Sequence, residues 1–176
     1  GDATSGDDVL KLMNGKQADL VFTDPPYNVD YEGSDGKKIK NDKMEDSAFY
    51  QFLFDAFVAM YTVMKEGSPI YVCHADSEGR NFRNAFEDAG FLMKQTIVWV
   101  KNALVLGRQD YQWKHEPILY GWKPGAAHKW YGGRKETTVF EDPVDLVIDK
   151  NKDHSILTFS NGERSVVVKV PKYEII

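Results

Sequence analysis

The residues best suited to chemistry in this sequence are Asp24-Pro25-Pro26-Tyr27, which directly follow the apolar run 18–23. Two successive prolines fix φ and lack an N–H, so the chain can neither continue a strand ladder nor enter a helix interior there. The run predicts a strand, and the stiff corner then projects Asp24 and Tyr27 from its carboxyl end, where open α/β sheets bind ligands. A carboxylate and a carbonyl accept hydrogen bonds from an amino group, and a phenol ring stacks on a base. This constellation suits chemistry on an exocyclic amine.

Such an amine is a poor nucleophile because its lone pair is delocalised into the aromatic ring. A site that accepts one N–H on Asp24 and the other on the carbonyl of Pro25 would concentrate the lone pair on nitrogen and stabilise its growing positive charge. Pro26 would stiffen the turn, and Tyr27 would stack on the base, which must leave the duplex to reach the pocket. In-line transfer of a group to that nitrogen then needs mainly positioning.

Length and composition indicate one globular domain. The 176 residues are 42% apolar and 13% aromatic, and no apolar run approaches the roughly 20 residues that span a bilayer. The single cysteine, Cys73, lies in the strand-like run 70–73, which predicts a buried, inert thiol and a reducing, cytoplasmic compartment. The lack of a spanning apolar run means that no membrane partner is expected. The four histidines and one cysteine show no ligand spacing, so no metal is expected.

The net charge of −5 conceals a basic segment. Residues 94–135 hold eight Lys or Arg and two acids, which makes this segment +6 and leaves −11 for the rest of the chain. All four tryptophans also fall within it, at Trp99, Trp113, Trp122 and Trp130. Cations interleaved with aromatic rings favour a surface that follows phosphates and stacks on bases. A tryptophan-rich core with solvated lysines between the rings remains the alternative.

Hydrophobic spacing predicts an α/β fold. Expected strands are 18–23, 70–74, 95–100 and 117–122, and expected helices are a Ser5-capped helix ending at Gly15, a helix from Asp46 or Ser47 to Gly67, and one from Ser77 to Gly90. Strands that alternate with helices indicate a parallel sheet covered on both faces. Right-handed crossovers would place Asp24, His74 and Lys101 along one rim of that sheet.

The last forty residues differ in pattern. Runs 146–148, 155–159 and 165–170 alternate apolar and polar side chains, and Asn161-Gly162 between two of them is a strong hairpin signal. We therefore expect a catalytic, target-binding part at residues 1–140 and an antiparallel β-meander, as an extension or insertion, at residues 141–176.

On these residues the sequence resembles the amino-methyltransferases that modify adenine N6 or cytosine N4 in DNA, including those of restriction-modification systems. The resemblance is carried by residues 23–28, 97–102 and 115–123 and covers roughly residues 1–140. It implies a Rossmann-like methyltransferase sheet and S-adenosyl-methionine as cofactor. It also implies that Asp24 and Pro25 bind the target amine and that Tyr27 stacks on the base. Aspartate at position 24 is the version associated with adenine.

The sequence departs from that family in one respect. The Phe-x-Gly-x-Gly loop that binds S-adenosyl-methionine is absent, and Gly132-Gly133 does not replace it. The chain therefore resembles the amino-terminal, target-binding part of the subclass in which the catalytic motif comes first. The cofactor-binding half would follow in cis or be supplied in trans, in a bacterial or phage-like cytoplasm. By analogy, Asp24 and Asp2 would contact the cofactor.

Polar residues outside the motif are candidates for DNA contacts, with solvated surface charge as the alternative. They are Asn28, Tyr31, Lys101, Asn102, Arg108, Arg134 and Lys135. The lysine-rich loop 37–43 would either close over a flipped nucleotide or stay solvated. His74 fits a structural histidine better than a site residue, and His115 and Glu116 would point to opposite faces of a strand.

Two other functions fit parts of this pattern. Enzymes with Asn-Pro-Pro-Tyr methylate protein glutamine or RNA guanine, but Asp24 argues against the glutamine branch. A non-catalytic DNA-binding module or pseudo-enzyme derived from the family would retain the motif, and the missing glycine loop adds weight to it. Binding of S-adenosyl-methionine separates these alternatives.

Overall fold

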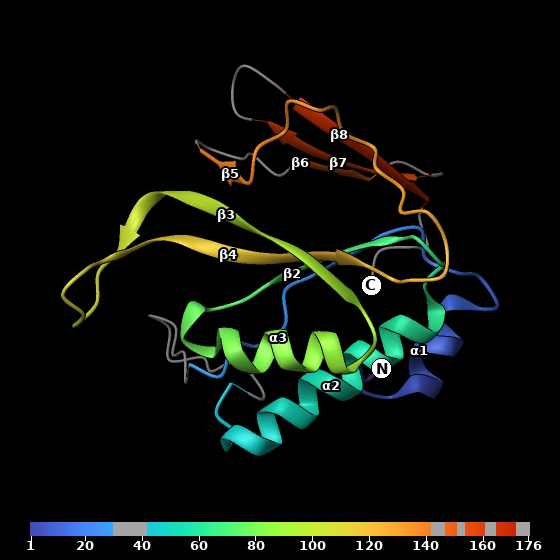
Figure 1. The fold of residues 1–176 in the computed structure, drawn as a ribbon, viewed down its shortest axis with the longest axis horizontal. Helices are drawn as coiled ribbons and strands as arrows, with labels where there is room; N and C mark the ends of the chain where they lie inside the picture. Colours follow the sequence, from blue (N-terminus) through green and yellow to red (C-terminus); the bar gives the residue numbers. More distant parts are fainter. Residues whose placement is uncertain (30–41, 142–146, 151–153, 161–164, 172–176) are drawn as a thin grey trace.

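The computed structural model describes residues 1–29, 42–141, 147–150, 154–160 and 165–171. Figure 1 shows helices beneath a five-stranded sheet, with a three-stranded sheet above it. The α/β class predicted from the sequence is confirmed. The described elements have the following bounds: α1 Gly6–Met13, β1 Val21–Thr23, α2 Asp46–Val63, β2 Pro69–Cys73, a 3₁₀ turn Asp76–Glu78, α3 Gly79–Asp88, β3 Leu92–Val105, β4 Trp113–Trp122, β5 Val139–Phe140, β6 Val147–Lys150, β7 His154–Ser160 and β8 Ser165–Pro171.

The first helix forms as its sequence predicts. The Oγ atom of Ser5 accepts a hydrogen bond from the N–H of Asp8 at 3.3 Å, which satisfies one of the free donors of the first turn. The helix ends where Asn14 and Gly15 take positive φ values of 47° and 76°. Val9 and Met13 on one face are buried against the rest of the core.

The strand order is β1-β2-β4-β3-β5. The pairs β1–β2 and β3–β5 are parallel, whereas β4 is antiparallel to both β2 and β3. Four strands therefore point the same way, and the expectation of a parallel sheet needs correction at β4. The connection from β3 to β4 covers only residues 106–112, and a parallel crossover needs a dozen residues or more.

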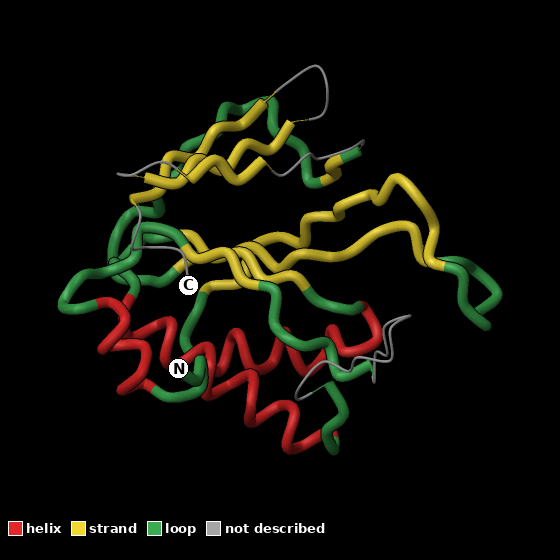
Figure 2. Tube along the Cα trace, turned by 180° about the vertical axis from the view of Figure 1, so that it is seen from behind, coloured by secondary structure: helices red, strands yellow, loops and turns green. Residues whose placement is uncertain are grey.

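The predicted helical cover on both faces of the sheet is wrong for the described residues. All three helices lie on one side of the five-stranded sheet (Figures 1 and 2). The path from β1 through β2 to β3 always steps in the same direction across the sheet. Right-handed crossovers with a constant direction place α2 and α3 on the same side.

The two faces of the sheet carry different cores. On the helical side, Val72 and Leu119 pack with Phe57 and Phe86, and all four are at most 1% exposed. The opposite face carries an aromatic cluster together with the buried Cys73, whose thiol pKa is raised to about 12 by burial, as expected for an inert cysteine. Its rings are Phe22, Tyr27, Tyr71, Trp99, Tyr120, Trp122 and Phe140.

One part of the basic, tryptophan-rich segment belongs to the core and another part to the surface. Tyr120 is buried and Trp122 is half-buried in the aromatic cluster, so this part is core. Tyr111 and Tyr131 are exposed by 91% and 64% and belong to the surface. The predicted carboxyl-terminal meander is confirmed, because β6, β7 and β8 pair in that order and antiparallel (Figure 2).

Candidate active site

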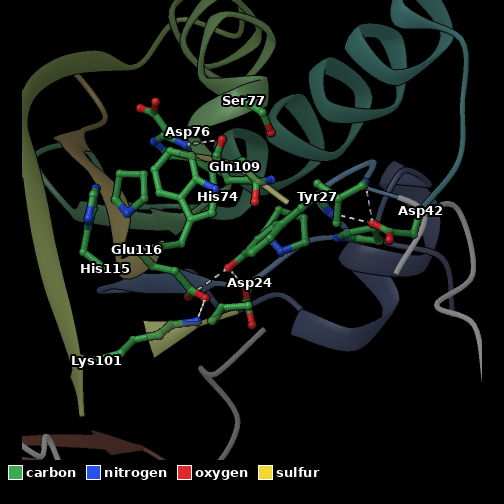
Figure 3. Close-up of a pocket in the computed structure, with 17 residues that line it drawn as sticks. Asp24, Tyr27, Asp42, His74, Asp76, Ser77, Lys101, Gln109, His115 and Glu116 are labelled. Carbon is green, nitrogen blue, oxygen red and sulfur yellow. Dashed lines mark hydrogen bonds and ion pairs between the residues drawn. The ribbon is translucent and has the colours of Figure 1, made fainter. Parts of the chain in front are cut away.

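The strand ends meet at one rim of the five-stranded sheet, as predicted. β1 ends before Asp24 and β2 ends before His74, while β4 runs in the opposite direction and brings Glu116 to the same rim. These residues and Lys101 of β3 line a cavity of about 910 Å³ (Figure 3). This volume is in the range of small-molecule sites, and a nucleobase fits within it.

The proline corner holds Asp24 and Tyr27 together. The Tyr27 hydroxyl donates a hydrogen bond to Oδ1 of Asp24 at 2.5 Å, and Glu116 Oε2 lies 3.4 Å from the same hydroxyl. Asp24 is exposed, whereas Tyr27 is half-buried with its ring edge-on to Phe82. Burial first, and then the hydrogen bond to the Asp24 carboxylate, raise the pKa of Tyr27 far above its ordinary value. The phenol is therefore neutral and available as a donor.

A second carboxylate fixes the backbone after the prolines. Oδ1 of Asp42, which is only 3% exposed, accepts hydrogen bonds from the N–H groups of Tyr27 at 3.0 Å and of Val29 at 3.4 Å. Asn28 has a positive φ of 60°, and its side-chain amide forms two hydrogen bonds with the backbone of Met44. Sequence reasoning missed Asp42 because no pattern in the polar segment that contains it distinguishes a buried carboxylate from a solvated one.

Glu116 is the most important site residue to which sequence reasoning gave no role. It lines the cavity together with His115, although the two side chains were expected on opposite faces of a strand. Its carboxylate forms an ion pair with Lys101, and both side chains are about three-quarters buried, with 22% and 27% exposed. The Lys101 ammonium also lies 5.7 Å from the centre of the Trp99 ring. Lys101 is thus held by a carboxylate inside the site, and this pairing competes with its predicted contact to DNA.

The His74 ring packs in the core, but one of its two ring nitrogens has no hydrogen-bond partner among the described residues. Its ring stacks on Phe82 with 5.3 Å between centroids, and Nδ1 lies 3.0 Å from the carbonyl oxygen of Ala75. Nδ1 therefore carries the proton, and Nε2 has a lone pair that finds no partner among the described residues. Burial lowers the pKa of His74 below 6.5, so the ring is neutral at neutral pH. The packing of the ring agrees with the predicted structural histidine. His74 also lines the cavity, which that prediction did not include.

The remaining predicted residues lie outside the cavity or outside the described ranges. Asn102, Arg108, Arg134 and Lys135 are exposed, and they stay predicted DNA contacts. Tyr31 and most of the lysine-rich loop 37–43 lie outside the described residues. Asp2 accepts hydrogen bonds from Thr4 ahead of α1 and is not part of the cavity lining, so nothing in its position supports a cofactor contact.

The cavity has an acidic character. Asp24, Asp42, Asp76 and Glu116 all contribute to its lining, together with the cation of Lys101. Within the described part of the chain, no group of three or more His, Cys, Asp or Glu side chains has the geometry of a metal site. Among the described helices, none is both long and apolar enough to cross a bilayer.

Known proteins are similar to this chain in sequence and in fold. The profile of the family described as DNA methylase, N6_N4_Mtase, matches residues 18–167. DNA adenine methyltransferase YhdJ of Escherichia coli (strain K12) is 27% identical over 113 residues, 62% of this chain and 36% of that protein. Type II methyltransferase M.BglII of Bacillus subtilis is 24% identical over 151 residues, 80% of this chain and 37% of that protein. The chain thus spans little more than a third of the length of these two relatives.

The fold likewise matches a solved structure. The crystal structure of the M1.HpyAVI–SAM complex superposes with a TM-score of 0.52 at 17% identity. The match covers 78% of this chain and 61% of that one. At this identity the likeness concerns the fold.

Proposed function

This chain belongs to the N6_N4_Mtase family of DNA methylases, and from that premise we propose that it binds the target base of a methyl transfer. The reaction moves a methyl group from S-adenosyl-methionine to the exocyclic amine of a base flipped out of DNA, with adenine N6 favoured over cytosine N4. The observation that carries the proposal is Asp24, followed by the two prolines and Tyr27, at the mouth of a cavity of about 910 Å³. The name of the relative YhdJ, a DNA adenine methyltransferase, supports the preference for adenine.

The residues of this chain act on the amine through hydrogen bonds. Asp24 accepts one N–H of the amine and the Pro25 carbonyl accepts the other, so the nitrogen lone pair turns toward the incoming methyl group. The positive charge that grows on nitrogen is stabilised by the carboxylate of Asp24. Tyr27 contacts the face of the base, and its neutral hydroxyl, whose pKa is raised by burial, adds no charge there. The cavity walls limit the orientations that the base can take.

The acidic lining of the cavity fits the cofactor's charge. S-adenosyl-methionine carries a sulfonium cation and an ammonium group, and carboxylates such as Asp24 and Asp76 would attract both. When bound, it supplies the electrophilic methyl group. Groups that hold its adenosine part would come from a cofactor-binding half carried in cis or in trans, because the glycine loop of the family is absent from this sequence.

The experiment supplies the chain with a cofactor-binding half, fused or as a second polypeptide. The substrate is unmethylated genomic DNA with radiolabelled S-adenosyl-methionine, and the methylated nucleosides are identified by mass spectrometry. N6-methyladenine that disappears in the Asp24→Ala variant supports the proposal, and N4-methylcytosine would correct the base. DNA binding without any transfer would instead identify a non-catalytic DNA-binding module.

A further inference from the structure

The strands β3 and β4 extend beyond the rest of the sheet as a long hairpin with an apolar end. The hairpin projects to one side of the molecule, away from the helices (Figures 1 and 2). Near its tip, Leu106 is 84% exposed and Tyr111 is 91% exposed, while Leu104 and Val105 are each 52% exposed. Large apolar side chains gathered at this exposure on one element indicate a contact surface rather than a core.

The hairpin is continuous with the candidate active site. Val105, Gln109 and Trp113 line the same cavity as Asp24 and Tyr27. Figure 3 draws Gln109 among the residues that line this cavity, together with His74 and Asp24. A base held at Asp24 would therefore have the tip of this hairpin next to the nucleotides from which it came.

The tip is held in shape before any partner binds. Oε1 of Gln112 accepts a hydrogen bond from the N–H of Gly107 at 2.6 Å, and its Nε2 donates one to the carbonyl of Gln109 at 2.8 Å. A register shift between Val100 and Val105 disrupts the β3–β4 ladder just before the tip. Irregular pairing of this kind bends a hairpin and often lies beside functional sites. The braced loop can thus act as a rigid element.

The charges around the tip suit a polyanion. Arg108 and Lys114 are exposed, and Asp110 is the only acidic residue from Asn102 to Lys114. Cations that flank an exposed aliphatic and an exposed aromatic side chain are the composition of a wedge that enters DNA between bases. A surface for a second copy of the chain would have no need of these cations.

We propose that the hairpin tip, residues 106–111, inserts into duplex DNA beside the target nucleotide and fills the gap which that nucleotide leaves in the base stack. This inference rests on the proposed function, since it assumes that a base enters the cavity at Asp24. Removing a base from the stack costs free energy, because its stacking and pairing are lost. Leu106 and Tyr111 recover part of this energy by contacting the bases on either side of the gap.

The test compares two duplexes of one mixed sequence at one fixed salt concentration, without cofactor. One duplex is intact, and the other has an abasic site with 2-aminopurine as its neighbour. The parent chain should bind the abasic duplex about tenfold more tightly, because no base has to be unstacked, and should quench the 2-aminopurine emission. The double variant Leu106→Ala/Tyr111→Ala should lose both the preference and the quenching. Leu12→Ala on α1, which removes a side chain that is 60% exposed, serves as the matched control and should change neither.

The other outcomes are distinguishable. If the parent binds DNA but the double variant keeps the preference and the quenching, the wedge is excluded and the proposed function stands. If the parent binds neither duplex, DNA is not its partner and both proposals fall. If the double variant only converts a dimer to a monomer in solution, the hairpin is a self-association surface and the wedge is again excluded.

Discussion

The hydroxyl of Tyr27 lies 2.5 Å from the carboxylate oxygen Oδ1 of Asp24, the group that would accept the target amine. The Tyr27 hydroxyl thus occupies the carboxylate oxygen that the proposed reaction needs as an acceptor for the amine. Glu116 Oε2, at 3.4 Å, is a second acceptor for the same hydroxyl. We infer that the Tyr27 proton turns toward Glu116 when an amine arrives at Asp24. The hydrogen bond is therefore a feature of the site before it binds a base.

The two roles of Tyr27 can be separated by substitution. Tyr27→Phe keeps the ring and removes the hydroxyl, so methyl transfer should change by less than about tenfold. Tyr27→Ala removes the stacking surface and should lower transfer by about a hundredfold, because base–aromatic stacking contributes roughly 1–3 kcal/mol per base. Steady-state rates on a methylatable duplex measure both effects. Equal losses in the two variants would assign the role to the hydroxyl instead of the ring.

Asp24→Asn should abolish most of the methyl transfer while the protein stays folded. Loss of one preorganised acceptor costs about a hundredfold to a thousandfold in rate. Since Asp24 is exposed and makes one hydrogen bond to Tyr27, unfolding free energy should change by about 1 kcal/mol or less. Urea denaturation and rates on the same preparation provide both numbers. Asp7→Asn on the exposed face of α1 is the control. Unchanged activity in Asp24→Asn would show that this carboxylate is not the acceptor of the target amine.

The Lys101–Glu116 ion pair should show strong coupling in stability. Either single variant, Lys101→Met or Glu116→Gln, leaves one largely buried group without its partner and should cost about 1–3 kcal/mol. The double variant should cost less than the sum of the two, because no uncompensated charge remains. Urea denaturation of the parent and three variants completes this double-mutant cycle. Additive losses would mean that the pair contributes no interaction energy.

His74 should make stability depend on pH in a defined direction. Burial is the main cause of its lowered pKa, the Arg83 charge adds to it, and the Ala75 carbonyl and Asp76 oppose it. The unfolded chain therefore takes up a proton below pH 6.5 that the folded chain resists, so this stability is complete above pH 6.5 and declines as pH falls below it. His74→Asn should flatten this decline, measured by urea denaturation at several pH values. A pH slope in His74→Asn equal to that of the parent would contradict this role of His74.

Gly121 should be intolerant of any side chain. A Cβ atom there would lie 2.2 Å from the backbone oxygen of Leu92 on the neighbouring strand β3. Gly121→Ala must therefore push β3 and β4 apart and should cost about 1–3 kcal/mol of unfolding free energy. Gly6→Ala is the matched control because its added Cβ meets no atom within 4 Å. Thermal denaturation distinguishes the two, and an unaffected Gly121→Ala protein would contradict the close strand approach.

The local elements of this protein could be predicted from its sequence. Ser5 caps α1, the apolar stripe of α2 is buried, and the three terminal strands form a meander, because each depends on neighbours a few residues away. The proline corner after β1 is equally local. Together with the alternation of strands and helices, it was enough to place Asp24 at the carboxyl rim of the sheet.

Only the tertiary structure decided the direction of β4, the one-sided helical cover and the full membership of the site. Glu116 lies 89 residues after Tyr27 in the chain, and it reaches the phenol because β4 enters the sheet between β2 and β3 in the reverse direction. Asp42 reaches the backbone after the prolines from 15 residues away. Spacing in a sequence reports contacts within one helix or strand. Contacts between elements depend on strand order and register, which are set by how all the apolar faces are buried together.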